Sequence, residues 1–157
     1  HLDARLVTDG LAAAELLPAD VLFIENVGNL VCPASYALGE DFKVVLLSVA
    51  EGDDKPFKYP AIFSRAAVSV ITKMDLMPHV GFDLERATNQ IKSLNPDARI
   101  LTVSATTGRG MHEWRELLTQ RLTAKRSAVR EGAPPSAARF APVARDTPHT
   151  SQAPSLS

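Results

Sequence analysis

The stretch Val68-Ser69-Val70-Ile71-Thr72-Lys73-Met74-Asp75 joins a short run of β-branched residues to a polar tetrad. Three further apolar runs of the same kind cover residues 21–24, 44–49 and 100–103. Continuous rather than alternating apolar runs are typical of parallel strands that are buried on both faces. Apolar residues at helical spacing predict helices over about 2–14, 59–66, 84–94 and 111–122. This order predicts an α/β fold with a parallel, doubly wound sheet.

The composition is that of an ordinary globular domain, and it excludes several classes of protein. The 157 residues are 45% apolar and 22% charged, with a net charge of -1, which disfavours a nucleic-acid partner. No apolar run approaches the ~18 residues of a membrane span, and no secretory leader is visible, so we expect no membrane partner. The single cysteine, Cys32, excludes an internal disulfide and fits a reducing compartment, so we expect a cytoplasmic protein. The first residue is His1 rather than Met, so we expect a fragment of a longer protein.

The last part of the chain differs in composition from the rest. Residues 126–157 are rich in Pro, Ser and Ala and contain few large apolar side chains. Such a segment buries too little surface to offset the entropy of ordering it. The sequence therefore predicts a folded part over 1–125 and a disordered tail over 126–157, with a docking arm as the alternative for the tail.

The tetrad Thr72-Lys73-Met74-Asp75 is the first candidate site, because ligands bind at the carboxyl ends of strands in such sheets. The Asp75 carboxylate can accept two hydrogen bonds from the imino and amino groups of guanine, and a polar match of this kind rejects bases that lack those donors. The Lys73 stem can lie over the purine. The Thr72 hydroxyl can tie the loop to its neighbours. The alternative is a polar strand exit in which Asp75 caps a turn.

A second candidate loop, Ser104 to Gly108, follows the last run. A small residue at Ala105 lets the backbone approach a ligand, so its amide can donate to the guanine keto oxygen. The alternative is a connecting loop in which Thr106 or Thr107 caps the last helix. Together with the T-K-x-D tetrad, one helix and one strand upstream, this loop has the order that GTPases use to recognise guanine.

Two other loops follow predicted strands. Glu25 can orient a magnesium-bound water, and Gly28 can offer its amide to a terminal phosphate, as in the D-x-x-G element of GTPases with Glu in place of Asp. The alternative here is a strand-end turn built from Asn and Gly. Residues 50–56 form a polar loop, which we interpret as a solvated connector.

Together these segments resemble the hydrogenase nickel-incorporation GTPases of the HypB family. The matching stretches are residues 1–4, ENVGNLVCPA at 25–34, and the segments 38–60, 72–78 and 103–111, so that the resemblance covers about residues 1–122. It implies a dimeric P-loop GTPase of the SIMIBI type that uses GTP and Mg²⁺. It also implies a role in inserting nickel into nickel-iron hydrogenase, with hydrogenase maturation proteins and the hydrogenase large subunit as partners. The related urease accessory GTPase UreG shares the architecture but is not expected to carry this Val-Cys-Pro.

The resemblance also shows what the sequence lacks. Family members carry a phosphate loop, G-x-x-x-x-G-K-[ST], and no stretch of this sequence matches it. We therefore expect the C-terminal part of a GTPase domain that does not hydrolyse GTP alone, which leaves open whether the chain acts as an enzyme. Strand edges that the missing half would cover should be exposed and lower the solubility.

The resemblance also implies a metal site. The family uses a Cys-His pair and a cysteine after the switch glycine, and the matching residues here are His1 and Cys32. Imidazole and thiolate suit Zn²⁺ or Ni²⁺, and a dimer could complete the ligand set. The alternative for Cys32 is a small buried apolar residue. The alternatives for the whole chain are a non-catalytic, metal-dependent dimerisation or metallochaperone module, and a UreG-like protein.

Overall fold

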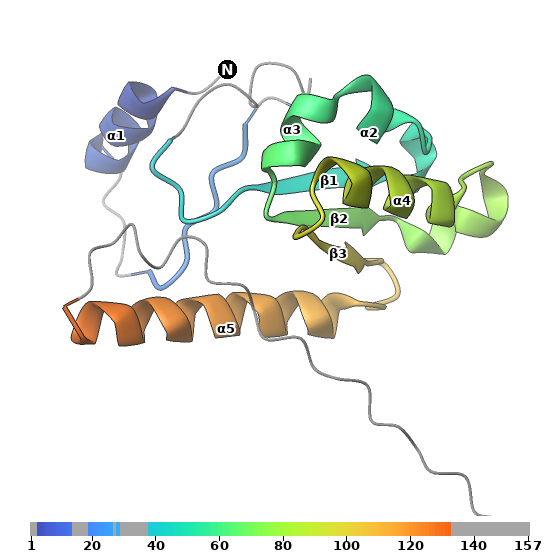
Figure 1. Cartoon of the computed structure of the whole chain (residues 1–157). Helices are drawn as coiled ribbons and strands as arrows, with labels where there is room; N and C mark the ends of the chain where they lie inside the picture. The colour runs from blue at the N-terminus through green and yellow to red at the C-terminus, as the bar shows by residue number, and fades with distance from the viewer. Residues whose placement is uncertain (1–2, 14–18, 27, 29–37, 133–157) are drawn as a thin grey trace, which may run out of the picture.

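The computed structural model describes residues 3–13, 19–26, 28 and 38–132. Its strands and helices largely follow the predicted order (Figure 1). In chain order the elements are α1 (Ala4–Ala13), β1 (Val44–Ser48), η2 (Val49–Glu51), α2 (Lys55–Lys58), α3 (Pro60–Arg65), β2 (Val68–Thr72), η3 (Met74–His79), α4 (Leu84–Leu94), β3 (Arg99–Thr102) and α5 (Met111–Arg130).

The three strands form one parallel sheet in the order β1-β2-β3. The register pairs Val44 of β1 with Val68 of β2, and Val68 with Arg99 of β3. Helix α3 lies in the connection from β1 to β2, and α4 lies in the connection from β2 to β3. A parallel sheet needs crossovers of this kind, so the predicted βαβ arrangement is confirmed.

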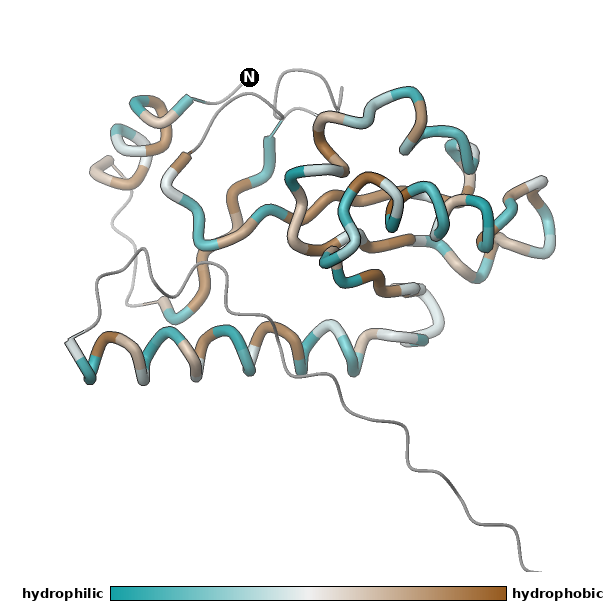
Figure 2. The backbone as a smooth tube through the Cα atoms, in the orientation of Figure 1, coloured by the Kyte–Doolittle hydropathy of each residue, from teal (hydrophilic) through white to brown (hydrophobic). Residues whose placement is uncertain are grey.

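Helices cover both faces of the sheet (Figure 1). On one face, side chains of β1 and β2 pack against α3 and α4 around the fully buried Phe63, Ile71 and Ile91. On the other face, Val70 and Leu101 pack with Leu117 of α5, and these residues are also buried. Figure 2 shows the same arrangement as apolar strands between helices that alternate polar and apolar turns. The doubly wound prediction is thus confirmed, on a sheet of three strands.

The predicted strand at residues 21–24 is wrong. This segment has no regular secondary structure and pairs with no strand among the described residues, and Leu22 and Phe23 are 51% and 66% exposed. An apolar run forms a strand only where a neighbouring backbone accepts its hydrogen bonds. Here the segment lies against α5 instead, with the Phe23 and Trp114 ring centroids 6.4 Å apart and an ion pair between Asp20 and Arg126.

The C-terminal boundary also differs from the prediction. Helix α5 continues to Arg130, so residues 126–130 are helical although their composition assigned them to the tail. Alanine and arginine favour helices, and Arg126 forms an ion pair with Asp20, which extends the contact of this helix with the rest of the chain. The predicted disorder of residues 133–157 lies outside the described residues. None of the described helices is both long enough and apolar enough to cross a membrane.

Residues 50–56 are more ordered than a solvated connector. Their first residues belong to η2, and α2 begins at Lys55 with Pro56 in its first turn, where proline needs no hydrogen-bond acceptor. Pro56 is buried, and η2 packs against η3. The loop therefore lies beside the segment that carries the T-K-x-D tetrad.

Candidate functional site

The turn after β2 is built around a left-handed residue. Lys73 has φ 59° and ψ 38°, and it is the only residue other than glycine with positive φ in the described part of the chain. The turn carries Met74 into the core, where it is 5% exposed and its N–H donates to the Val103 carbonyl at 3.1 Å. Such a conformation costs a non-glycine residue about 1–2 kcal/mol and is common at functional sites. The neighbouring contacts hold it in place and leave the Lys73 side chain exposed.

The loop after β3 closes around Ser104, which is fully buried. The Ser104 N–H donates to the Arg109 carbonyl at 2.8 Å, and the Ser104 carbonyl accepts from the Gly108 N–H at 2.9 Å. Helix α5 then begins after Gly110, which is its N-cap and has φ 71°. The alternative interpretation of this loop, in which Thr106 or Thr107 caps the last helix, is therefore wrong.

A hydrogen bond joins the two predicted base-reading loops. The Ser104 hydroxyl donates to Asp75 Oδ1 at 2.6 Å, across 29 positions of sequence. The same hydroxyl oxygen accepts from the Thr107 N–H at 3.2 Å. Asp75 is therefore held by a tertiary contact rather than by a local turn. One carboxylate oxygen is fixed by the Ser104 hydroxyl, which orients the whole group.

The other predicted base-reading residues lie on the same two loops. Thr72 is half-buried at the end of β2, and Ala105 is exposed next to Ser104. No acceptor for the Ala105 N–H is found among the residues that the structure describes. The structure thus brings together the loops of the predicted site, in the arrangement that the sheet rule requires.

The predicted magnesium and phosphate residues are less well defined. Glu25 and Gly28 are both exposed, and their neighbours at positions 27 and 29–37 lie outside the described residues. Their roles therefore stay predictions. The predicted metal ligands His1 and Cys32 also lie outside the described residues. Within the part that is described, no three His, Cys, Asp or Glu side chains come together as a metal site.

Sequence reasoning missed Asp53, in the loop that it assigned to a solvated connector. Its side chain is only 15% exposed and contacts the start of α4. Asp53 Oδ2 accepts from the Asp83 N–H at 3.1 Å, and Oδ1 lies 3.6 Å from Arg86 Nη1. Only the acidic character of the loop could have signalled this contact, and it does not identify the partner.

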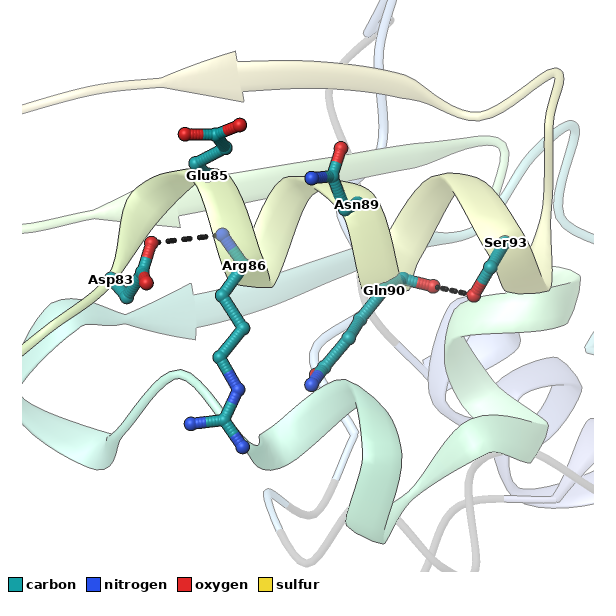
Figure 3. A pocket seen from close by; sticks show the side chains of 6 residues that line it. All are labelled: Asp83, Glu85, Arg86, Asn89, Gln90 and Ser93. Carbon is teal, nitrogen blue, oxygen red and sulfur yellow. Dashed lines mark hydrogen bonds between the residues drawn. The ribbon is translucent and has the colours of Figure 1, made fainter.

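A shallow polar groove follows the outer face of α4 (Figure 3). It is lined by Asp83, Glu85, Arg86, Asn89, Gln90 and Ser93. Asp83 caps the helix by accepting from the Arg86 N–H at 2.9 Å, and the Ser93 hydroxyl donates to the Gln90 carbonyl at 2.7 Å. All six residues belong to α4 or its cap, and Arg86 and Gln90 point toward a neighbouring helix (Figure 3), so the groove is an open surface along one helix.

Comparison with known proteins agrees with this fold. Residues 4–102 match the family described as "CobW/HypB/UreG, nucleotide-binding domain". The chain is 50% identical over 125 residues to the hydrogenase maturation factor HypB of Escherichia coli (strain K12). This alignment covers 77% of this chain and 42% of that protein. It is 47% identical over 137 residues to HypB of Azotobacter vinelandii, covering 85% of this chain and 45% of that protein. The chain thus spans less than half the length of these relatives.

Solved structures give the same result. The crystal structure of HypB from Archaeoglobus fulgidus matches with a TM-score of 0.68 and 41% identity, over 78% of this chain and 59% of that one. HypB from Helicobacter pylori in complex with nickel matches with a TM-score of 0.60 and 37% identity, over 62% of this chain and 45% of that one. The expected resemblance to HypB is confirmed. The chain belongs to the CobW/HypB/UreG nucleotide-binding domain family.

Proposed function

We propose that this chain is the guanine-reading part of a GTP-binding accessory protein that inserts nickel during the maturation of nickel-iron hydrogenase. The observation that carries the guanine-reading part of the proposal is the 2.6 Å hydrogen bond between Ser104 and Asp75, which joins the two loops predicted to read the base. The relatives from Escherichia coli and Azotobacter vinelandii are hydrogenase maturation factors HypB, which favours this role over that of a UreG-like urease accessory protein.

The base would be read by polar groups on the two loops. Asp75, oriented by Ser104, would accept from the imino and amino groups of guanine, and the Ala105 amide would donate to its keto oxygen. The Lys73 stem would lie over the purine face, with its ammonium group in water. A base without the guanine donors would leave this carboxylate unpaired, which is the physical source of the specificity.

The remaining roles are proposed from the family. Glu25 and Gly28 would sense Mg²⁺ and the terminal phosphate, and His1 with Cys32 would take part in a Ni²⁺ or Zn²⁺ site shared by two copies in a homodimer. We propose that hydrogenase maturation proteins and the hydrogenase large subunit are the partners, and that the protein acts in the cytoplasm. A phosphate loop is needed for hydrolysis, so we propose that this chain alone binds nucleotide without hydrolysing GTP.

Nucleotide titration of the chain followed by amide NMR tests the guanine site, because it detects weak binding and locates it. We expect GDP, and not ADP, to shift the amides of residues 72–75 and 104–108. Asp75→Asn should remove the preference for GDP and favour the xanthine nucleotide, whose second carbonyl can accept from the new amide. Asp97→Asn, an exposed aspartate before β3, is the matched control and should leave the titration unchanged.

Failure of this titration would have a definite meaning. If GDP and ADP give the same shifts, or none, the guanine-reading function is wrong. If the chain then binds Ni²⁺ or Zn²⁺ and dimerises, and Cys32→Ser abolishes the dimer, the metal-dependent module replaces it.

A further inference from the structure

Asp53 forms a contact that the proposed base-reading chemistry does not use. Its side chain is only 15% exposed although it lies in a surface loop, between η2 and α2. Oδ2 accepts from the backbone N–H of Asp83, which is the residue that caps α4. A partly buried carboxylate that accepts from a backbone amide is stabilising, and losing it leaves that donor without its protein partner.

The contact acts on the segment that begins with the base-reading turn. Residues 74–83 leave the sheet at Met74 and return to the fold at Phe82, which is 7% exposed in the core. At the front, the Met74 N–H and the Asp75 carboxylate are held by the loop after β3. At the rear, Asp53 holds the Asp83 N–H at 3.1 Å.

The middle of this segment rests on the same loop that carries Asp53. The 3-10 turn η3 packs against η2, and η2 ends only two residues before Asp53. The loop after β1 therefore supports the base-reading segment along its side and fastens its rear end. A segment fixed at both ends has fewer positions open to it, which keeps the Asp75 carboxylate oriented before a ligand arrives.

The ion pair with Arg86 contributes less than the amide contact. Arg86 is 57% exposed and its Nη1 atom lies 3.6 Å from Oδ1 of Asp53, and exposed pairs of this kind are worth little. The essential property of Asp53 is therefore an acceptor oxygen at this position rather than its negative charge.

We propose that Asp53 is a positioning residue for guanine recognition, which fastens the rear of the segment that carries Asp75. This inference rests on the proposed guanine site. It predicts that removing the acceptor loosens the base-reading segment and lowers the discrimination between guanine and close analogues, while the sheet and its core persist.

The test compares the binding of GDP and IDP to variants of the chain by amide NMR. IDP lacks the exocyclic amino group of guanine, so the ratio of the two affinities reports how well the Asp75 carboxylate is placed. We expect Asp53→Ala to lower this ratio about fivefold, the effect of roughly one hydrogen bond. Asp53→Asn should keep the ratio near that of the wild type, because the amide oxygen can still accept from Asp83.

Asp54→Ala is the matched control, since it removes the neighbouring carboxylate of the same loop. Asp54 pairs at 2.6 Å with Lys58, within the loop and α2, and its interaction with α4 is limited to a weak coulombic attraction to Arg86. The Lys58 hydrogen bond holds the pKa of Asp54 below its usual value, so this carboxylate is charged at neutral pH. Its removal should leave the GDP/IDP ratio unchanged.

The outcomes separate this inference from the function on which it rests. If the wild type shows no preference for GDP over ADP, the proposed function fails and Asp53 has nothing to position. If the wild type discriminates but Asp53→Ala lowers GDP and IDP affinity equally, or changes neither, Asp53 is only structural and the inference is wrong. If Asp53→Ala unfolds the chain, Asp53→Glu takes its place and should also lower the GDP/IDP ratio, because it keeps the charge but moves the acceptor by one methylene group; an unchanged ratio would overturn the inference.

Discussion

The turn between β3 and α5 contains two glycines that differ in one structural respect. Gly108 and Gly110 have φ angles of 78° and 71°, which residues other than glycine rarely adopt. A β-carbon on Gly108 would meet no atom within 4 Å, whereas one on Gly110 would lie 2.0 Å from the Thr102 carbonyl oxygen. Gly108→Ala and Gly110→Ala therefore separate the cost of the backbone conformation from the cost of a steric clash.

The expected magnitudes follow from these two terms. An alanine in the left-handed region costs about 1–2 kcal/mol, which is the whole loss expected for Gly108→Ala. Gly110→Ala adds an overlap with a backbone atom that cannot rotate away, so the turn has to move. Moving it breaks the hydrogen bond from Ser104 to the Arg109 carbonyl, about 1 kcal/mol, and shifts the first turn of α5. We expect a total loss of about 3–5 kcal/mol for Gly110→Ala.

Urea unfolding followed by tryptophan fluorescence measures this difference. Trp114 is the only tryptophan of the chain, and it packs against the core on the α5 face of the sheet. Gly110→Ala should also weaken GDP binding more than Gly108→Ala, because the displaced loop carries Ser104. If the two variants lose the same stability, the close approach of Gly110 to Thr102 does not exist in solution.

Three further predictions follow from single residues. Lys73→Gly should raise the free energy of unfolding by about 1 kcal/mol, because glycine relieves the positive φ, yet it should weaken GDP binding in the NMR titration. A loss of stability would show that Lys73 is not strained. Ser69→Ala should leave the free energy of unfolding unchanged or raise it by up to about 1 kcal/mol, since the buried Ser69 hydroxyl has no hydrogen-bond partner in the described part of the chain. A clear loss of stability in urea would show that the hydroxyl does have a partner. Leu47→Ala should lower the free energy of unfolding by about 2–5 kcal/mol, because Leu47 is fully buried. Leu46→Ala on the same strand should cost much less, because Leu46 is 61% exposed. Equal losses of stability in urea would contradict the observed burial.

The apolar runs predicted three strands correctly and failed at residues 21–24 for a definite reason. A run of β-branched residues reports that a segment can be buried in a parallel sheet, but not that a neighbouring strand is available. The strand β2 has neighbours on both sides and is buried along most of its length. In β1, at the edge of the sheet, Leu46 is 61% exposed although the sequence of this strand is almost entirely apolar, as in a buried strand. Residues 21–24 have no strand beside them in the described part of the chain, so the same pattern gives no strand there.

The candidate site shows the same division between what local patterns report and what they do not. The nearness of the loops that carry Asp75 and Ser104 could be predicted, because both follow parallel strands that are neighbours, and the carboxyl ends of such strands lie at one edge. The contact between Asp53 and Asp83 could not, because it joins a loop to a helix cap and follows from no periodicity. Strand order thus identifies the groups that would touch a base, while the groups that hold them become visible only in three dimensions. A variant at Asp53 is therefore the stronger test of the structure, and a variant at Asp75 is the stronger test of the sequence.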